Sequence, residues 1–227
     1  MTQPHPYNPL DKKNLGASVA DALLGRKPKP LQGLPSFFGA GIYAIYYQGR
    51  FRPFRPYWRL AALNQDDDPQ APIYVGKAIP EGGRKGSGVF DASTTKALHR
   101  RLKEHADSID ATSNLLSADF CCRFLPVEDI WIPLGESLLI AKFSPVWNIL
   151  IDGFGNHDPG SGRYKGLKPR WDVLHPGRVW AEKCQPRDES AEDIGRELEA
   201  HLAAEPSLVR TRFLAEQPVP AWTFGKT

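Results

Sequence analysis

The stretch Gly41-Ile42-Tyr43-Ala44-Ile45-Tyr46-Tyr47 decides the fold of this chain. Its β-branched and aromatic side chains are typical of a strand, which we place at residues 40–48 with Gly49 as its end. Side chains alternate between the two faces of a strand. One face is therefore predicted to carry Tyr43, Ile45 and Tyr47, and the other Ile42, Ala44 and Tyr46.

A second strand is predicted at Pro72 to Lys77, where the sequence reads Tyr-Val-Gly-Lys at 74–77. It forms a hairpin with the first strand across a connection much longer than a tight turn. A helix capped by Asp91 or Ser93 should follow, because apolar residues recur at helical spacing. This helix runs through Ala97, Leu98, Leu102 and His105.

A third strand at 119–127 and a second helix at about 130–143 complete the order β, β, α, β, α. The second helix is predicted to end at Ser144-Pro145, since proline disfavours helical backbone before it. Its inward side chains are expected to be Leu134, Leu138, Leu139 and Ala141. The fold class is therefore α+β, with a small, mainly antiparallel three-stranded sheet flanked by helices.

The other segments are predicted as additions to this core within a single domain. Residues 1–39 form an N-terminal arm with a helix around 15–24 and a basic break at 26–30. The core spans 40–150 and contains an insertion at 50–71. Residues 151–227 form a loop-rich segment followed by helices at 190–203 and 207–215. The arm is long enough to wrap a partner or a sister subunit.

Composition and charge narrow the functional classes. The net charge is only +3, but Lys and Arg outnumber Asp and Glu strongly between residues 25 and 103. A concentration of basic surface is what a polyanion such as nucleic acid requires. The 3 cysteines are odd in number and give neither a disulfide framework nor a CxxC metal pattern. Without an apolar signal core or a membrane-length apolar run, we expect a cytoplasmic protein.

Separate fragments of the chain supply groups suited to cutting a phosphodiester. The candidates are two phenols, a guanidinium, an imidazole, a carboxylate and an amide: Tyr43, Tyr74, Arg101, His105, Glu136 and Asn148. The reaction needs a nucleophilic water, positive charge at the phosphate and relief of charge on the leaving 3′ oxygen. Arg101 and His105 lie four apart on one helix face, so both can approach a single phosphate.

Each candidate also has a simpler interpretation. Glu136 lies among leucines, where it either binds magnesium together with water and substrate phosphate or forms an ion pair with a neighbour such as Lys142 or Arg101. Strand tyrosines are more often packing groups, and a tyrosine base needs nearby positive charge, for which Lys77 is a supporting candidate. His105 alone could be an ordinary surface histidine. Asn148 is expected to brace the active-site strands.

Basic residues outside this set are candidate DNA contacts. They lie in the basic and aromatic insertion, in a glycine-rich loop and after the segment Asp152-Gly153-Phe154-Gly155-Asn156-His157: Arg50, Arg52, Arg55, Arg59, Arg84, Lys85, Arg163, Lys165, Lys168 and Arg170. Arginine and lysine bind phosphates and read guanine edges. The alternative is an ordinary surface on which arginine side chains extend to solvent.

Taken in order, the fragments resemble the GIY-YIG nuclease superfamily. The resemblance rests on Gly-Ile-Tyr at 41–43, Tyr-Val-Gly at 74–76, Arg101, Glu136 and Asn148. Four segments are similar to its stand-alone Type II restriction endonucleases: Arg-Leu-Lys-Glu-His at 101–105, Pro-Val-Trp-Asn at 145–148, the glycine-rich segment 152–163 and the segment 171–183. The resemblance covers about 38–184, with Val75 in place of isoleucine and His105 where many relatives have tyrosine.

The resemblance implies roles for these residues. Tyr43 would be the general base or orient the water, Tyr74 and His105 would hold water and phosphate, and Arg101 would stabilise the transition state. Glu136 would be the sole protein ligand of one Mg²⁺ or Mn²⁺ per active site, and Asn148 would brace the site. Whether Tyr43 or His105 is the base stays open.

The resemblance also implies a substrate and partners. The protein would cut double-stranded DNA as a homodimer at a palindrome such as CCGCGG, leaving 5′-phosphate and 3′-hydroxyl ends, with a cognate DNA methyltransferase in the same system. Two alternatives remain at this point. One is a repair or homing-type nuclease of the same superfamily, and the other is a non-catalytic DNA-binding protein.

Overall fold

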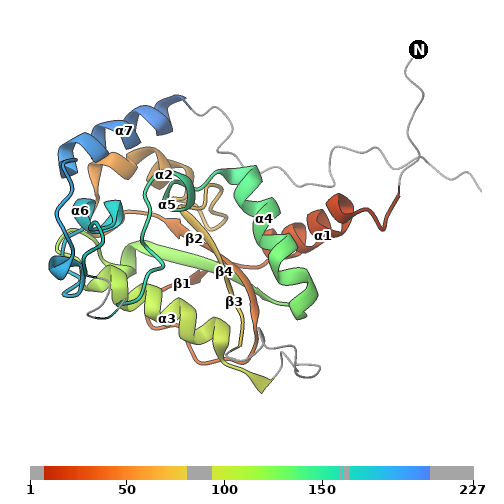
Figure 1. The fold of residues 1–227 in the computed structure, drawn as a ribbon. Helices are drawn as coiled ribbons and strands as arrows, with labels where there is room; N and C mark the ends of the chain where they lie inside the picture. The colour runs from red at the N-terminus through yellow and green to blue at the C-terminus, as the bar shows by residue number, and fades with distance from the viewer. Residues whose placement is uncertain (1–7, 81–93, 159, 161–163, 205–227) are drawn as a thin grey trace, which may run out of the picture.

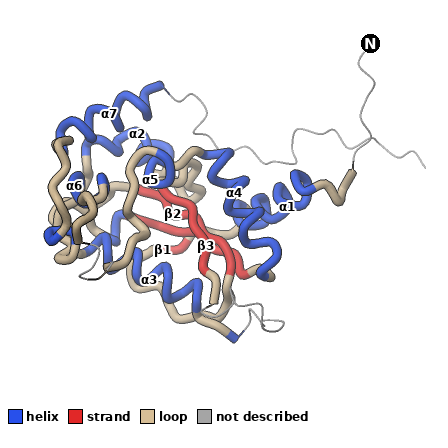
Figure 2. Tube along the Cα trace, viewed as in Figure 1, coloured by secondary structure: helices blue, strands red, loops and turns tan. Residues whose placement is uncertain are grey.

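A four-stranded antiparallel sheet forms the centre of the molecule in the computed structural model, which describes residues 8–80, 94–158, 160 and 164–204. The strand order is β1-β4-β2-β3, and Figures 1 and 2 show the sheet surrounded by helices. The strands are β1 (Lys29–Pro30), β2 (Gly41–Tyr47), β3 (Tyr74–Ala78) and β4 (Phe120–Pro126). The predicted α+β class and hairpin are confirmed, with one strand more than expected.

Strand β2 is buried along its whole length. Tyr43, Ile45 and Tyr47 belong to one hydrophobic cluster and Ile42, Ala44 and Tyr46 to a second one on the other face, as the alternation predicts. Gly41 begins the strand because β4 passes too close for a side chain. A Cβ at Gly41 would lie 2.1 Å from the carbonyl oxygen of Leu125.

Helices cover both faces of the sheet. Helix α3 (Ala97–Asp110) packs Leu98 and Leu102 into the cluster that contains Tyr43. Helices α1 (Lys12–Leu24) and α4 (Ile132–Phe143) cover the opposite face and lie side by side in Figure 1. The predicted arm is thus partly built into the core, because α1 packs on α4 and β1 pairs with β4.

Two details of the predicted helices need correction. Helix α4 starts at Ile132, after a 3₁₀ turn, η5 (Asp129–Trp131), and Ala141 is exposed rather than inward. Leu139 and Phe143, four residues apart, occupy the buried face, and Ala141 between them points the other way because each residue advances 100°. The helix ends at Ser144 in the left-handed conformation, followed by Pro145. The predicted caps Asp91 and Ser93 lie outside the described residues.

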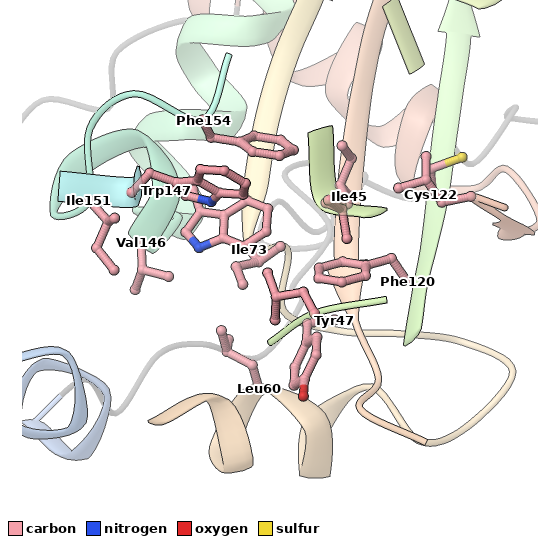
Figure 3. Close-up of a cluster of buried hydrophobic side chains, with 14 of the residues drawn as sticks. Ile45, Tyr47, Leu60, Ile73, Phe120, Cys122, Val146, Trp147, Ile151 and Phe154 are labelled. Carbon is pink, nitrogen blue, oxygen red and sulfur yellow. The ribbon is translucent and has the colours of Figure 1, made fainter. Parts of the chain in front are cut away.

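The insertion at 50–71 folds onto the C-terminal part of the chain. It contains η1 (Arg55–Tyr57) and α2 (Trp58–Leu63), and Tyr57 is fully buried. Its hydroxyl lies 2.7 Å from His175 Nε2 and accepts a hydrogen bond from Trp147 Nε1 at 2.7 Å. Figure 3 shows part of this core, where Trp147 and Phe154 lie near Ile73.

The end of the core and the C-terminal segment contain short helices that the sequence did not reveal. These are α5 (Val146–Ile149), α6 (Arg170–Leu174) and η7 (Ala181–Lys183), and α7 (Ala191–Ala204) follows near its predicted place. The helix predicted at 207–215 lies outside the described residues. None of the helices in the described ranges is both long and apolar enough to cross a membrane.

Candidate active site

A buried hydrogen bond joins strand β2 to helix α3. Tyr43 Oη on β2 lies 2.7 Å from Nε2 of His105 on α3, and the two residues are 0% and 1% exposed. Burial, reinforced by Arg101, holds the pKa of His105 well below its usual value. Burial and the neighbouring Tyr74 raise the pKa of Tyr43 well above 10. Both groups are therefore neutral at pH 7, and the phenol donates when the imidazole carries its proton on Nδ1.

Gly76 explains why the second motif needs a glycine. It pairs with Tyr43 across the hairpin, and a Cβ there would lie 2.4 Å from Tyr43 Oη. The ring of Tyr74, two residues earlier, has its centroid 6.2 Å from that of Tyr43 and 5.3 Å from that of His105. Burial raises the pKa of Tyr74, and Arg101 opposes the shift. The hairpin thus brings both phenols to one imidazole.

Arg101 lies at the edge of this cluster, with 21% of its side chain exposed. Its Nη2 donates to the carbonyl of Gly155 at 2.7 Å, and its Nη1 donates to His157 Nε2 at 2.7 Å. A weaker contact of 3.2 Å joins Nη1 to Glu104. The guanidinium is thus held beside the phenols by two residues of a distant loop.

Glu136 on α4 pairs with Lys77 on β3, with 2.7 Å between Oε2 and Nζ and 17% of the glutamate side chain exposed. The partner is neither Lys142 nor Arg101, the two that the sequence suggested. The charge of Glu136 contributes to the raised pKa of Tyr43, so the carboxylate lies within electrostatic reach of the phenols.

The donor set around Glu136 fits a magnesium-type ion with few protein ligands. Within the ranges that the structure describes, no group of three His, Cys, Asp or Glu residues could hold a metal. A single carboxylate completed by phosphate oxygens and water is a common way to bind Mg²⁺. Glu136 would hold the ion, which would supply Lewis-acid stabilisation to a phosphate.

Asn148 braces the edge strand of the sheet. Its Oδ1 accepts from the N–H of Val75 and its Nδ2 donates to the carbonyl of Val75, both at 2.8 Å. Strand β3 has a partner strand on one side only, so the amide satisfies backbone groups that no neighbouring strand reaches. This contact fixes the strand between Tyr74 and Lys77.

With this geometry in place, the chain can be compared with known protein families. A family model for the Eco29kI GIY-YIG domain covers residues 35–202. The chain belongs to this family. No curated protein matches the chain. The family is one of restriction endonucleases and supports a nuclease that acts on DNA, and GIY-YIG nucleases generally depend on a divalent metal.

The GIY-YIG site also includes a loop whose role the sequence did not reveal. Phe154 stacks on His105 with ring centroids 4.5 Å apart and an interplanar angle of 17°. A Cβ at Gly155 would lie 2.9 Å from both Arg101 Nη2 and Tyr74 Oη, so a side chain there would displace at least one of these two groups. The sequence signal for this close approach is the pair of glycines, Gly153 and Gly155, on both sides of Phe154.

All four predicted DNA contacts in the insertion have partners within the chain. Arg50, Arg52 and Arg59 donate to backbone carbonyls, and Arg55 lies 3.8 Å from Glu199. These contacts tie the insertion to its surroundings, and contact with DNA would require the side chains to exchange partners.

Among the later predicted DNA contacts, two also have partners within the chain. Lys168 pairs with Glu182 at 2.8 Å, and Arg170 pairs with Glu189 and Glu197. Lys165 is exposed. The remaining candidates, Arg84, Lys85 and Arg163, lie outside the described residues.

Proposed function

We propose that the chain is a Type II restriction endonuclease that hydrolyses double-stranded DNA at a short palindrome and leaves 5′-phosphate and 3′-hydroxyl ends. The observation that carries this proposal is the buried hydrogen bond from Tyr43 to His105, with Arg101 and Glu136 beside it. Together these groups supply a proton acceptor for water, a fixed positive charge and a ligand for Mg²⁺ or Mn²⁺.

Tyr43 and His105 act together as the general base. Tyr43 Oη takes a proton from the attacking water while its own proton passes to His105 Nε2. The water oxygen then bonds to phosphorus as the bond from phosphorus to the 3′ oxygen breaks, and that oxygen takes a proton from solvent. His105 afterwards returns a proton to Tyr43 as the Tyr43 hydroxyl releases one to solvent, which restores the site. The imidazolium formed in this way is unfavourable in a buried site beside Arg101, so the negative phosphate must be present to offset it.

Arg101 neutralises charge on the phosphate as the bond to water forms. Its planar guanidinium can meet two phosphate oxygens at once and never loses its charge. It now donates to Gly155 and His157, and substrate oxygens would compete for these donors. Tyr74 orients the water beside Tyr43, and Lys77 keeps the carboxylate of Glu136 in place before the metal binds.

One such site cuts one strand, so cleavage of both strands of a palindrome requires two copies of the chain. We therefore propose a homodimer, with CCGCGG as the first sequence to test and a methyltransferase of the same specificity protecting host DNA. The enzyme would act in the cytoplasm, where DNA is present and Cys121, Cys122 and Cys184 stay reduced.

Digestion of plasmid DNA in the presence of Mg²⁺ tests this proposal. The wild type should give discrete fragments whose mapped ends report sequence, symmetry and overhang together. Tyr43→Phe should slow cleavage by about 10²-fold or more, the usual contribution of a general base, and Glu136→Gln should abolish it. Tyr47→Phe is the matched control, because Tyr47 lies on the same strand and face as Tyr43 and is 1% exposed. This variant should keep nearly full activity.

Two results would contradict the proposal. If Tyr43→Phe and Glu136→Gln cut as fast as the wild type, the assigned site is wrong. If the wild type binds DNA in a salt-sensitive manner and never cuts it with Mg²⁺ or Mn²⁺, the chain is a DNA-binding protein instead.

A further inference from the structure

The loop from Gly153 to His157 covers the site and holds its guanidinium. Phe154 lies over His105, the carbonyl of Gly155 accepts from Arg101 Nη2, and His157 accepts from Arg101 Nη1. The loop follows the short helix α5 and has no strand or long helix of its own to fix its shape. Its conformation must therefore be set by contacts with other parts of the chain.

Arg178 supplies these contacts from outside the site. Its Nη2 donates to the carbonyl of Gly153 at 2.9 Å, and its Nη1 donates to the carbonyls of Phe154 and Asn156 at 3.1 Å each. The two remaining N–H groups donate to the carboxylate of Asp172, at 2.7 Å from Nε and 2.5 Å from Nη2. All five donors of the guanidinium are thus used.

The pair of Arg178 and Asp172 is closed off from solvent. The two side chains are 4% and 1% exposed. The guanidinium lies 4.5 Å from the ring centroid of Trp171 and 4.7 Å from that of Trp180. Burial of two charges is costly unless their donors and acceptors are satisfied. Any movement that breaks one of these hydrogen bonds would therefore be unfavourable, which keeps the pair in one arrangement.

We propose that Arg178 and Asp172 form a positioning unit that fixes the loop 153–157 and, through it, aims Arg101 at the substrate phosphate. The proposal rests on the function proposed above. Arg178 makes no contact with Arg101 itself and acts through the carbonyl of Gly155 and the side chain of His157. A small displacement of Arg101 from the reacting phosphate should slow cleavage considerably. Arg178 should therefore affect the cleavage rate although it lies outside the site.

Arg178→Lys tests the positioning unit, because lysine keeps the charge but offers three donors from a single atom. The matched control is Arg123→Lys on β4. Arg123 is 1% exposed, donates to the carbonyls of Arg26 and Pro69 and pairs with Asp68, on the opposite sheet face from Tyr43. Both variants lose a buried guanidinium that donates to backbone carbonyls and pairs with an aspartate, with five hydrogen bonds at Arg178 and three at Arg123.

The first readout is the single-turnover rate of plasmid cleavage with saturating protein and Mg²⁺, at a temperature where circular dichroism shows each variant folded. Arg178→Lys should cleave at least about tenfold more slowly, with plasmid binding in Ca²⁺ changed less than about threefold. Arg123→Lys should cleave at the wild-type rate. Equal rates for Arg178→Lys and the wild type, or equal losses in both variants, would overturn the proposal.

The second readout does not depend on cleavage. Amide hydrogen exchange of the intact protein should become faster at 153–157 and around Arg101 in Arg178→Lys, and remain unchanged there in Arg123→Lys. Unchanged protection of the loop in Arg178→Lys would overturn the positioning unit even if the wild type cuts DNA. A wild type that does not cut DNA would refute the proposed function alone, since the exchange experiment still decides how the loop is held.

Discussion

Lys77 pairs with Glu136, the carboxylate that we propose as the metal ligand. The pair of Lys77 and Glu136 is the reason that this carboxylate is tolerated on a helix packed against the sheet, since its charge is balanced at 2.7 Å. The same contact competes with a divalent ion for the carboxylate. The DNA-free protein should therefore bind a divalent metal less tightly than a protein in which Glu136 has no lysine partner.

Lys77→Met should raise the affinity of the DNA-free protein for Mn²⁺ by about fivefold, because a partly exposed ion pair contributes up to about 1 kcal/mol. Titration calorimetry or electron paramagnetic resonance of bound Mn²⁺ measures this directly. Lys103→Met is the control, because it removes the same charge from an ion pair with Asp107 on α3. Equal affinities in the two variants would show that Lys77 does not compete with the metal.

The partner of Glu136 illustrates what sequence could not predict at the residue scale. Arg101 and His105 could be grouped from helical spacing, and Tyr43 and Tyr74 could be added only from the order of the motifs, because 62 positions separate Tyr43 from His105. Lys77 became the partner because β3 crosses α4, a tertiary contact without a sequence period. His157 was missed because a loop without a sequence period brings it to Arg101.

Elements differ in how well their patterns predict them. Strand β2 has seven residues in alternation, and α3 shows a clear apolar stripe, so both were found. Strand β1 has two residues and α6 has five, too few for a period to emerge. Both owe their form to tertiary contacts. Strand β1 pairs with β4, and Trp171 of α6 is buried in the main cluster.

Helix α4 keeps its position because α1 approaches it closely at Gly16. A Cβ there would lie 2.1 Å from Leu138 Cδ1 and 2.9 Å from Leu134 Cγ. Gly16→Val should lower the free energy of unfolding by about 1–3 kcal/mol through overpacking, as measured by urea denaturation. Because α4 carries Glu136, the variant should also lose nuclease activity.

Gly195→Ala on α7 is the control for replacing a helical glycine as such. Its new Cβ would meet only Pro56 Cγ, at 3.7 Å, which is ordinary contact. This variant should gain up to about 1 kcal/mol from the better helix propensity of alanine. A Gly16→Val protein as stable as the wild type would mean that α1 and α4 are not tightly packed.

At the scale of the whole molecule, one buried network ties the insertion to the C-terminal segment. His175 Nε2 meets the hydroxyl of Tyr57, and Nδ1 lies 2.9 Å from Oδ1 of Asn114. Asn114 Nδ2 donates to the carbonyl of Leu174, which leaves Oδ1 to accept from His175. Burial, with a contribution from Arg178, lowers the pKa of His175 to about 3. The native protein therefore keeps this imidazole neutral, whereas the unfolded chain protonates it below pH about 6.5.

The stability of the protein should consequently fall as the pH falls from about 6.5 toward 3. In that window the unfolded state binds a proton that the native state excludes, which costs about 1.4 kcal/mol per pH unit. His175→Gln removes this proton uptake. The variant should be less stable than the wild type at pH 7, and its deficit in urea denaturation should shrink by about 2 kcal/mol at pH 5.

Asn64→Ala distinguishes this effect from the loss of any buried polar group. Asn64 is 0% exposed and donates to the carbonyls of Tyr47 and Ala71, but it does not titrate. Its deficit should therefore be the same at pH 7 and pH 5. A deficit of His175→Gln that is also independent of pH would mean that the native protein protonates His175 between pH 7 and pH 5, as the unfolded chain does. The neutral imidazole bonded to Tyr57 and Asn114 would then not be what holds the insertion.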